Sequence, residues 1–230
     1  MAVRVERSLE RRQEVVEAAV RLADRDGIDA VSMRNLADEL GVGTMTLYSY
    51  VSDKDELLDL MRDQVSREML VPEPLPDDWR EALRAIASRT RGALDRHAWV
   101  LKTIAHRPRV GLNTVRHIEQ SLRAVASLEA DDDTKGAILM AVDDYTIGHA
   151  IRARVRRARA GRRPPPSAAD LGPEVEAALA RGELPLLATA IAARGRESFP
   201  MPPEADFERG LDWLLDGIEA SVAGRVTVRT

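Results

Sequence analysis

The chain has 230 residues, of which 44% are hydrophobic, and a formal net charge of −4, so it can bury a sizeable core in one long domain or two smaller ones. It contains no cysteine, which excludes disulfides, thiolate chemistry and cysteine-based zinc sites. No run of about 18 apolar residues and no signal-like apolar segment occurs, which predicts a soluble, cytoplasmic protein with no membrane partner.

Helical spacing dominates the sequence from its first residues onward. Aromatic residues make up only 3%, Ala, Leu, Val and Arg recur at helical spacings, and no segment alternates with period two, so the predicted fold class is all-α. The first helix carries an apolar stripe at i, i+3, i+4, i+7 and i+8 that needs a packing partner. This stripe consists of Val15, Ala18, Ala19, Leu22 and Ala23. Gly27 is the predicted C-terminal cap of the helix.

A short second helix is predicted between a serine and a glycine. Ser32 is a good N-cap, and Gly41 stops the helix. Its apolar positions are Met33, Leu36, Ala37 and Leu40. Residues 41–43 then form a tight turn that leads into another helix.

The third predicted helix is about two turns long, over residues 44–50. Leu47 and Val51 are its apolar anchors, facing the first two helices, and Ser52 is the predicted cap of a fourth helix. A helix, a tight turn and a second short helix are typical of a helix-turn-helix, which places the start of its second helix in the DNA major groove.

The third helix is mostly polar. If its two anchors face inward, its other faces carry side chains that can meet base edges and phosphates. These side chains are Thr44, Met45, Thr46, Tyr48 and Tyr50. An ordinary solvated helix in a three-helix bundle shows the same spacing, so the pattern alone leaves both interpretations open.

The segment MRNLADELGVGTMTLYSYVSDKDELLDLM resembles the DNA-binding segment of the tet-repressor family of transcription factors. The resemblance rests on Leu-Ala-x-x-Leu-Gly-Val at residues 36–42, Thr-Leu-Tyr at residues 46–48 and Lys54, and it covers about residues 11–65. Val51 departs from the pattern, because the family usually has an aromatic residue there.

This resemblance implies a helix-turn-helix domain over residues 1–70 that binds double-stranded DNA. It implies base or groove contacts from Arg34, Gly43, Thr44, Met45 and Thr46. It implies phosphate contacts from Tyr48, Tyr50 and Lys54. The chemistry suits these roles, because an arginine can bind a guanine edge with two hydrogen bonds and methyl groups can contact the thymine methyl. The alternative role of Arg34 is a surface ion pair with Asp38.

The charge of the first domain opposes DNA binding. Residues 1–67 hold ten Arg or Lys against fourteen Asp or Glu, whereas affinity for DNA normally draws on neutralised phosphates. We therefore expect the acids to lie away from the groove, on the outer face of the first helix and on the fourth helix. Arg4, Arg7, Arg11 and Arg12 offset them, and this N-terminal cluster either follows the DNA backbone or belongs to a solvated terminus.

A second domain is predicted over residues 71–230, after the Pro-rich connector VPEPLPDDW. Two of its segments resemble the C-terminal domain of the same family: AVDDYTIGHAI, residues 141–151, and FERGLDWLLDGIE, residues 207–219. The resemblance implies a homodimer through helices near residues 136–158 and 205–221. A dimer would read a palindromic operator with half-sites about one DNA turn apart. Periodicity alone equally allows these helices to pack within one chain.

Polar and aromatic side chains of the second domain are candidates for an effector pocket. These candidates are Trp99, His106, Asn113, His117, Tyr145, His149 and Arg152. The last three share one helical face, at i, i+4 and i+7, which suggests either a pocket wall or a polar patch in the dimer interface. By resemblance, Arg152 stands where the tet repressor proper has a carboxylate that helps to bind a magnesium chelate, and an arginine cannot bind a divalent cation. We predict a small organic effector, with an anionic one compatible with Arg152, and neither a metal nor a cofactor.

Seven arginines and no acidic residue lie between positions 152 and 163. Cations favour the C-terminal end of a helix, and the prolines that follow fit a surface loop. We prefer this interpretation to a second nucleic-acid patch.

The predicted function is that of a dimeric transcriptional regulator, a repressor that a small-molecule effector releases from its operator. A helical adaptor that binds protein through the third helix is one alternative, and replacement of Tyr48 and Lys54 separates it from a DNA binder. A helical enzyme using His and Asp of the second domain is the other. Asp95 and His97 point to different helix faces, and the sequence has no phosphate-binding loop, nucleophile elbow or paired-His metal motif. We therefore predict that the protein is not an enzyme.

Overall fold

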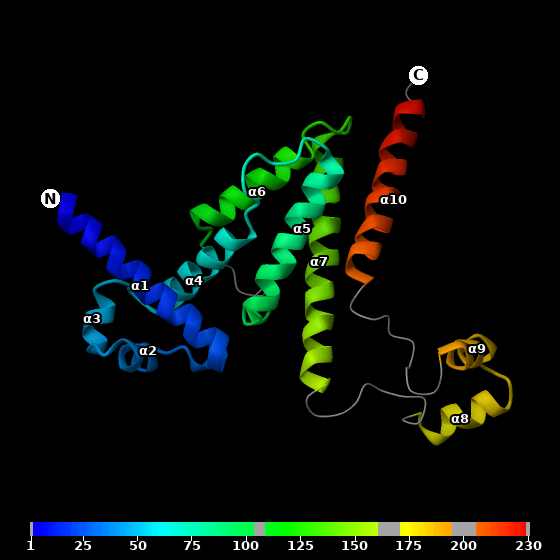
Figure 1. The fold of residues 1–230 in the computed structure, drawn as a ribbon, viewed down its shortest axis with the longest axis horizontal. Coiled ribbons are helices and arrows are strands. Elements are labelled where there is room, and N and C mark those ends of the chain that lie inside the picture. The colour runs from blue at the N-terminus through cyan, green and yellow to red at the C-terminus, as the bar shows by residue number, and fades with distance from the viewer. Residues whose placement is uncertain (1, 104–108, 161–170, 195–205, 229–230) are drawn as a thin grey trace. The chain divides into compact units, whose positions relative to one another are not determined.

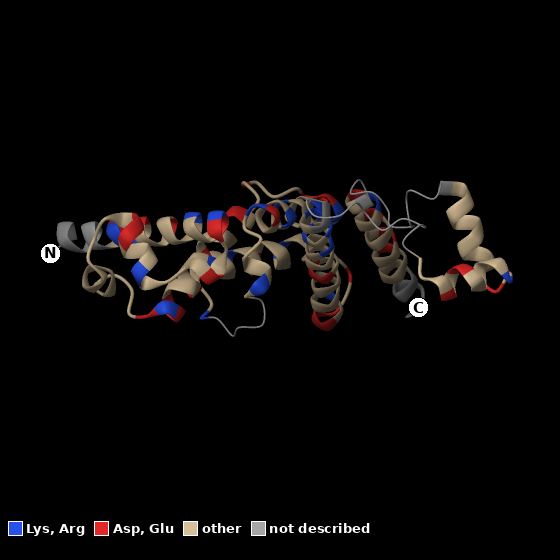
Figure 2. Cartoon of the chain, turned by 90° about the horizontal axis from the view of Figure 1, so that it is seen from below, with Lys and Arg blue, Asp and Glu red and all other residues tan. Residues whose placement is uncertain are grey.

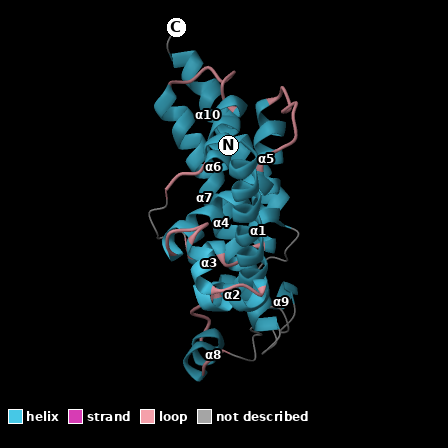
Figure 3. Ribbon diagram, turned by 90° about the vertical axis from the view of Figure 1, so that its left-hand side faces the viewer, coloured by secondary structure: helices cyan, strands magenta, loops and turns pink. Residues whose placement is uncertain are grey.

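Helices and loops make up the whole of the described chain (Figure 1, Figure 3). The computed structural model describes residues 2–103, 109–160, 171–194 and 206–228, and no strand occurs in these ranges. The predicted all-α fold is confirmed. The helices are α1 (Ala2–Asp26), α2 (Met33–Leu40), α3 (Thr44–Tyr48), α4 (Lys54–Met69), α5 (Trp79–Arg96), α6 (Leu112–Ala124), α7 (Asp132–Ala160), α8 (Pro173–Ala180), α9 (Pro185–Arg194) and α10 (Asp206–Val228), with 3-10 helices at Ile28–Ala30 and Val100–Lys102.

The chain divides into two compact units. Residues 1–150 and 214–230 form one unit, and residues 151–213 form the other. The functional boundary that the sequence predicts at residue 70 falls inside the first unit and stays a prediction.

The first helix ends, and the second helix begins and ends, where their local signals predict. The whole predicted stripe of α1 is buried, and Gly27 follows the helix with φ 88°. The Ser32 side chain accepts a hydrogen bond from the backbone N–H of Asn35, at 3.1 Å, and so caps α2. Gly41 ends α2 in the left-handed conformation, with φ 65°, which glycine adopts without steric cost.

Helix α3 is shorter than predicted. Leu47 and Val51 are each 1% exposed, which confirms both anchors. The helix nevertheless ends at Tyr48, and Tyr50 lies in the turn that follows. Ser49 explains the early end, because its hydroxyl donates to the Thr46 carbonyl at 2.6 Å and so satisfies an acceptor of the last turn.

The cap of α4 is Asp53, so the prediction of Ser52 is wrong by one residue. The Asp53 side chain accepts from the backbone N–H of Glu56 at 2.8 Å. Glu56 reaches back and accepts from both the N–H and the hydroxyl of Ser52, at 2.7 and 2.8 Å. The arrangement is similar to a capping box, but the Glu56 side chain returns to Ser52, one residue before the cap.

Asp53→Ala is expected to lower the melting temperature by a few degrees more than Ser52→Ala, because only Asp53 accepts from the first turn of α4. The hydrogen bond from Glu56 also lowers the pKa of Asp53 below its ordinary value of 3.8. The stability that the ionised Asp53 cap contributes is therefore present above pH 3.8 and is lost as the pH falls through the lowered pKa of Asp53. Circular dichroism melts of both variants at neutral and acidic pH measure the difference. An equal or larger loss in Ser52→Ala would contradict the assignment of the cap.

The core of the first unit joins the predicted helix-turn-helix to the helices that follow it. Helix α4 packs against α1, α5 and α6. The buried cluster that contains Leu36, Leu47 and Met61 also contains Trp99 and Ala150. Residues 1–70 therefore complete their core with side chains from beyond the predicted boundary.

None of the helices in the described ranges is long and apolar enough to cross a membrane.

Candidate nucleic-acid interface and effector residues

Residues 43–48, which form the turn and α3, make an exposed face. One buried side chain packs this face against the core. Leu47 is the only buried residue of α3. Met45 is 82% exposed and Tyr48 is 47% exposed, and Gly43, Thr44 and Thr46 are exposed as well. The structure therefore brings these predicted contact residues together on one surface, with their hydroxyl and methyl groups available to a partner.

The other predicted DNA contacts flank this surface. Arg34 on α2 and Lys54 at the start of α4 are exposed. Within the described part of the chain neither makes an ion pair, so the alternative pairing of Arg34 with Asp38 does not occur there. Tyr50 differs, because it is half-buried and packs against the core cluster.

Acidic side chains of the first 69 residues are largely engaged by other parts of the first unit. In the view of Figure 2, basic and acidic residues are interspersed along these helices. Several carboxylates bind groups of residues 96–114. These carboxylates are Asp24, Asp29, Asp59, Asp63 and Glu68. Glu39 pairs with Arg25 at 2.9 Å. Such internal partners reduce the repulsion that the acidic balance would otherwise exert on DNA.

Two arginines of the predicted N-terminal cluster have acidic partners. Arg11 pairs with Glu14 at 2.7 Å, and Arg12 pairs with Glu56 at the start of α4. The side chains of Arg4 and Arg7 lie outside the described residues. Arg12 therefore has a role within the first unit, where it ties α1 to α4.

His97 links three helices at the end of α5. It is 7% exposed, its Nδ1 lies 2.9 Å from a carboxylate oxygen of Asp24 on α1, and its Nε2 lies 3.0 Å from Glu68 on α4. The ring of His97 therefore connects the end of α5 to both α1 and α4. Burial works to raise the pKa of Glu68, but hydrogen bonds from Arg96 and His97 outweigh it and lower that pKa below 4.5.

Trp99 belongs to this buried junction. It is 3% exposed, and its Nε1–H donates to Asp24 at 2.8 Å. The indole of Trp99, a predicted effector contact, therefore binds α1.

Asp63 of α4 caps the start of α6. Gly111, the N-cap residue of α6, has no side chain that could do so. Asp63 instead accepts from the backbone N–H groups of Asn113 and Thr114, at 2.9 and 3.0 Å, and from the Asn113 side chain at 2.9 Å. A Cβ on Gly111 would overlap the Asp63 carboxyl group, so glycine permits the close approach. Asn113, another predicted effector contact, is therefore bound to α4.

The remaining predicted effector residues are distributed over α6 and α7. Burial lowers the pKa of His117 on α6. The rings of Tyr145 and His149 lie together on α7, with their centroids 6.3 Å apart. Arg152 is exposed and belongs to the second unit, and His106 lies outside the described residues. No group of three or more His, Asp or Glu within the described ranges could hold a metal ion.

Several residues of this junction carried no signal in the sequence. Asp24, Asp63, Glu68 and His97 act through partners that are 28 to 75 positions away. The one signal that could have been used is the lack of a capping side chain at Gly111, the N-cap residue of α6.

Comparisons with known proteins cover both halves of the chain. A family model described as "Bacterial regulatory proteins, tetR family" matches residues 15–61. A second model, "Tetracyclin repressor-like, C-terminal domain", matches residues 71–222.

Individual relatives are similar over most of their length. The HTH-type transcriptional repressor DrrR1 of Streptomyces coeruleorubidus is 38% identical over 92% of this chain and 78% of its own. The class A tetracycline repressor protein of Escherichia coli is 30% identical over 89% of this chain and 88% of its own. The crystal structure of the TetR family protein ActR from Streptomyces coelicolor, in complex with (S)-DNPA, superposes with a TM-score of 0.69 at 27% identity, over 92% of this chain and 98% of that one.

Proposed function

Because the chain belongs to the tetR family of bacterial regulatory proteins, and is thus a DNA-binding transcriptional regulator, we propose that the exposed face of α3 reads its operator. The proposal is supported chiefly by one observation. Leu47 is buried, whereas its neighbours on the same segment, residues 43–46 and Tyr48, are exposed. A face of this kind, at the start of the second helix of a helix-turn-helix, fits the major groove. The regulator would act in the cytoplasm, with no enzymatic activity.

The proposed contacts divide by chemistry. Arg34, Gly43, Thr44, Met45 and Thr46 would meet base edges or the groove floor. Tyr48, Tyr50 and Lys54 would meet phosphates. The phosphate group supplies affinity and register, and the base group supplies discrimination, of which a bidentate arginine–guanine pair provides about 1–3 kcal/mol.

Selection of bound sequences from a random duplex pool at about 0.1 M salt tests the proposal. A palindrome with half-sites about one turn apart is the expected result. A folded protein that enriches no motif would instead favour the alternative of a protein-binding adaptor.

Lys54→Ala is expected to weaken operator binding evenly across related sequences and to reduce the salt slope of log affinity by about 1, because one phosphate contact disappears. Tyr48→Phe, which removes one hydroxyl donor, is expected to weaken binding evenly too. Fluorescence anisotropy over a salt series measures both effects. Lys102→Ala is the matched control, since Lys102 pairs with Asp29 at 3.0 Å. An equal change in the control would count against a direct contact by Lys54.

We propose that the protein acts as a homodimer through helices near residues 136–158 and 205–221. Met140 and Trp213, in these ranges, are 61% and 69% exposed, as expected of apolar side chains that a partner covers. Light scattering should give a mass of about twice 25.4 kDa. Trp213→Asp should shift the protein toward the monomer, whereas Met45→Asp, at a still more exposed site on α3, should not. A dimer unaffected by Trp213→Asp would place the interface elsewhere.

An effector-binding role for the second domain, residues 71–230, completes the proposal. Helices α6 and α7 carry the half-buried His117 and the adjacent rings of Tyr145 and His149, and Arg152 would suit an anionic ligand. The similar protein ActR has been crystallised with (S)-DNPA. Repression is relieved if the effector binds one arrangement of the two DNA-reading heads better than the other.

A further inference from the structure

Helix α6 turns polar side chains inward and apolar side chains outward. Of the fourteen large hydrophobic side chains that are exposed in the described chain, five lie within residues 110–122, so they are concentrated on and just before α6. They are Val110, Leu112, Val115, Ile118 and Leu122, each 48–62% exposed. The last four recur every three or four residues and share one face of the helix. A surface helix normally buries such a face, and an exposed apolar patch marks an interaction site.

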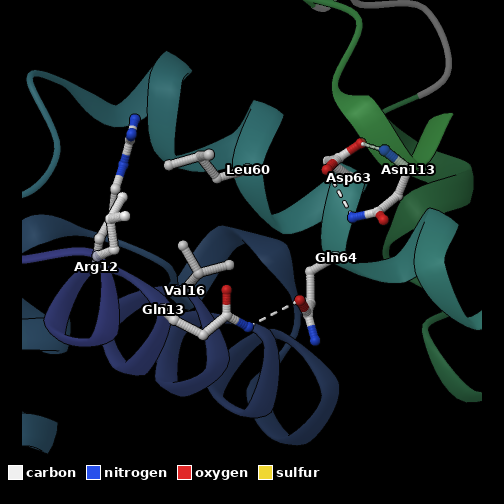
Figure 4. A pocket seen from close by; sticks show the side chains of 8 residues that line it. Arg12, Gln13, Val16, Leu60, Asp63, Gln64 and Asn113 are labelled. Carbon is white, nitrogen blue, oxygen red and sulfur yellow. Dashed lines mark hydrogen bonds between the residues drawn. The ribbon is translucent and has the colours of Figure 1, made fainter. Parts of the chain in front are cut away.

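The inward face of α6 is polar, and its groups are bound. Asn113 donates to Asp63 of α4 at 2.9 Å, and Figure 4 shows the two side chains directed at one another. Gln120, 6% exposed, accepts from the backbone N–H of Val71 at 3.0 Å and donates to its carbonyl at 2.8 Å. In the described part of the first unit, α6 packs against α4 and α5. These hydrogen bonds determine which face points inward, so the helix cannot roll its apolar face into the core.

Two charges of opposite sign lie along one edge of the apolar face. Arg116 and Glu119 are exposed, lie three residues apart, and form no ion pair with any described residue. Arg123, further along the helix, is already paired with Glu73 at 2.8 Å. The unpaired charges sum to zero, which disfavours a nucleic acid or an anionic lipid surface as the partner.

We propose that the apolar face of α6 pairs with the same face of a second copy, the two helices running antiparallel about a two-fold axis near Ile118. In this register Val115 faces Leu122 of the partner subunit. Arg116 faces Glu119 of the partner subunit, and the symmetry repeats that pair. A parallel pair would instead bring like charges together. The surface is therefore self-complementary, as an interface between identical copies requires.

This pairing is separate from the dimer proposed through helices near residues 136–158 and 205–221, and it is weaker. Specific, stable interfaces bury about 1,200–2,000 Å², which is more than one pair of 13-residue helices provides. Dilute protein should therefore remain dimeric, and concentrated protein should form pairs of dimers. Two dimers on one DNA duplex have a high effective concentration. The pairing would then favour joint occupancy of neighbouring operators, a consequence that rests on the proposed function.

Disulfide cross-linking tests the pairing in the full-length protein, because the chain has no cysteine of its own. Ile118→Cys places a thiol at the proposed axis, where facing positions of two packed helices come within disulfide distance. Under mild oxidation we expect linked chains and a native mass of about four times 25.4 kDa. The control Leu9→Cys, 59% exposed on α1, should cross-link at least about tenfold more slowly. Equal rates would overturn the proposal.

Reversal of the two charges tests the register in cysteine-free proteins. Arg116→Glu and Glu119→Arg each place like charges opposite one another twice, so each should weaken the association of dimers about tenfold. The double variant restores opposite charges and should recover the association. Sedimentation equilibrium over a concentration series measures all three. A double variant that associates no better than either single variant would rule out the antiparallel pairing.

The Trp213→Asp background separates this pairing from the proposed dimer. There Ile118→Cys should still cross-link, now into a species of about twice 25.4 kDa. Loss of cross-linking in this background would show that α6 does not pair on its own and would refute the proposal. None of these measurements needs DNA, so the pairing can fail while operator binding stands, and the reverse also holds.

Discussion

Replacing Leu47 by alanine is expected to lower the free energy of unfolding by about 3 kcal/mol and to abolish specific operator binding. Helix α3 has five residues and no side-chain cap at its start, so it is too short to form without tertiary support. Leu47, 1% exposed, is its one buried side chain. Without this contact α3 should unfold, and the side chains proposed to read the operator should lose their fixed positions. Denaturant unfolding and anisotropy with the selected operator measure the two effects.

Met45→Ala is the matched control for Leu47→Ala, two positions earlier on the same helix. Met45 is 82% exposed, so its replacement should change the unfolding free energy by less than about 0.5 kcal/mol. Operator affinity should still fall, because Met45 is a proposed groove contact. If Leu47→Ala keeps normal operator affinity, α3 is not the reading element.

Asp63→Ala is expected to lower the free energy of unfolding by about 2 kcal/mol, because the start of α6 loses its cap and two backbone N–H groups lose their acceptor. Hydrogen exchange should accelerate at the amides of Asn113 and Thr114. Asp63 on α4 and these amides on α6 are about 50 positions apart in the sequence. Faster hydrogen exchange on α6 would therefore result from a substitution on α4.

Asp59→Ala is the control for Asp63→Ala, one helical turn earlier on α4. Its carboxylate accepts from the backbone N–H of Arg109 at 3.1 Å, which is a single bond outside any helix, so a smaller loss is expected. Gly111→Ala should resemble Asp63→Ala, because the added Cβ overlaps the same carboxyl group. Unchanged exchange at both amides in Asp63→Ala would show that α6 forms without this cap.

Features coded by neighbouring residues could be predicted from the sequence. The stripe of α1, the cap at Ser32, the left-handed glycine at position 41 and the anchor Leu47 each depend on residues within a few positions. The error at the start of α4 has the same origin, because Ser52 and Asp53 are both good caps. The two candidates are distinguished only by Glu56, whose backbone N–H donates to the Asp53 side chain.

Features that depend on distant partners could not be predicted. Trp99 was expected in an effector pocket, but its indole N–H donates to Asp24, 75 positions earlier. His97 looks like an isolated histidine in the sequence, and the fold places it between two carboxylates. The acidic excess of the first domain has a similar explanation, since many of its carboxylates serve as acceptors for residues 96–114.

The shared core of the first unit limits how regulators of this kind can be recombined. Trp99 and Ala150 belong to the same buried cluster as Leu47 and Val51, the anchors of the proposed DNA-reading segment. A chimaera joined at residue 70 would leave α1 and α4 with an uncovered apolar surface and with carboxylates that have lost their donors. A graft that carries the operator preference of this chain to another scaffold should therefore extend through α5 and the start of α6 and retain the contact made by Ala150 of α7.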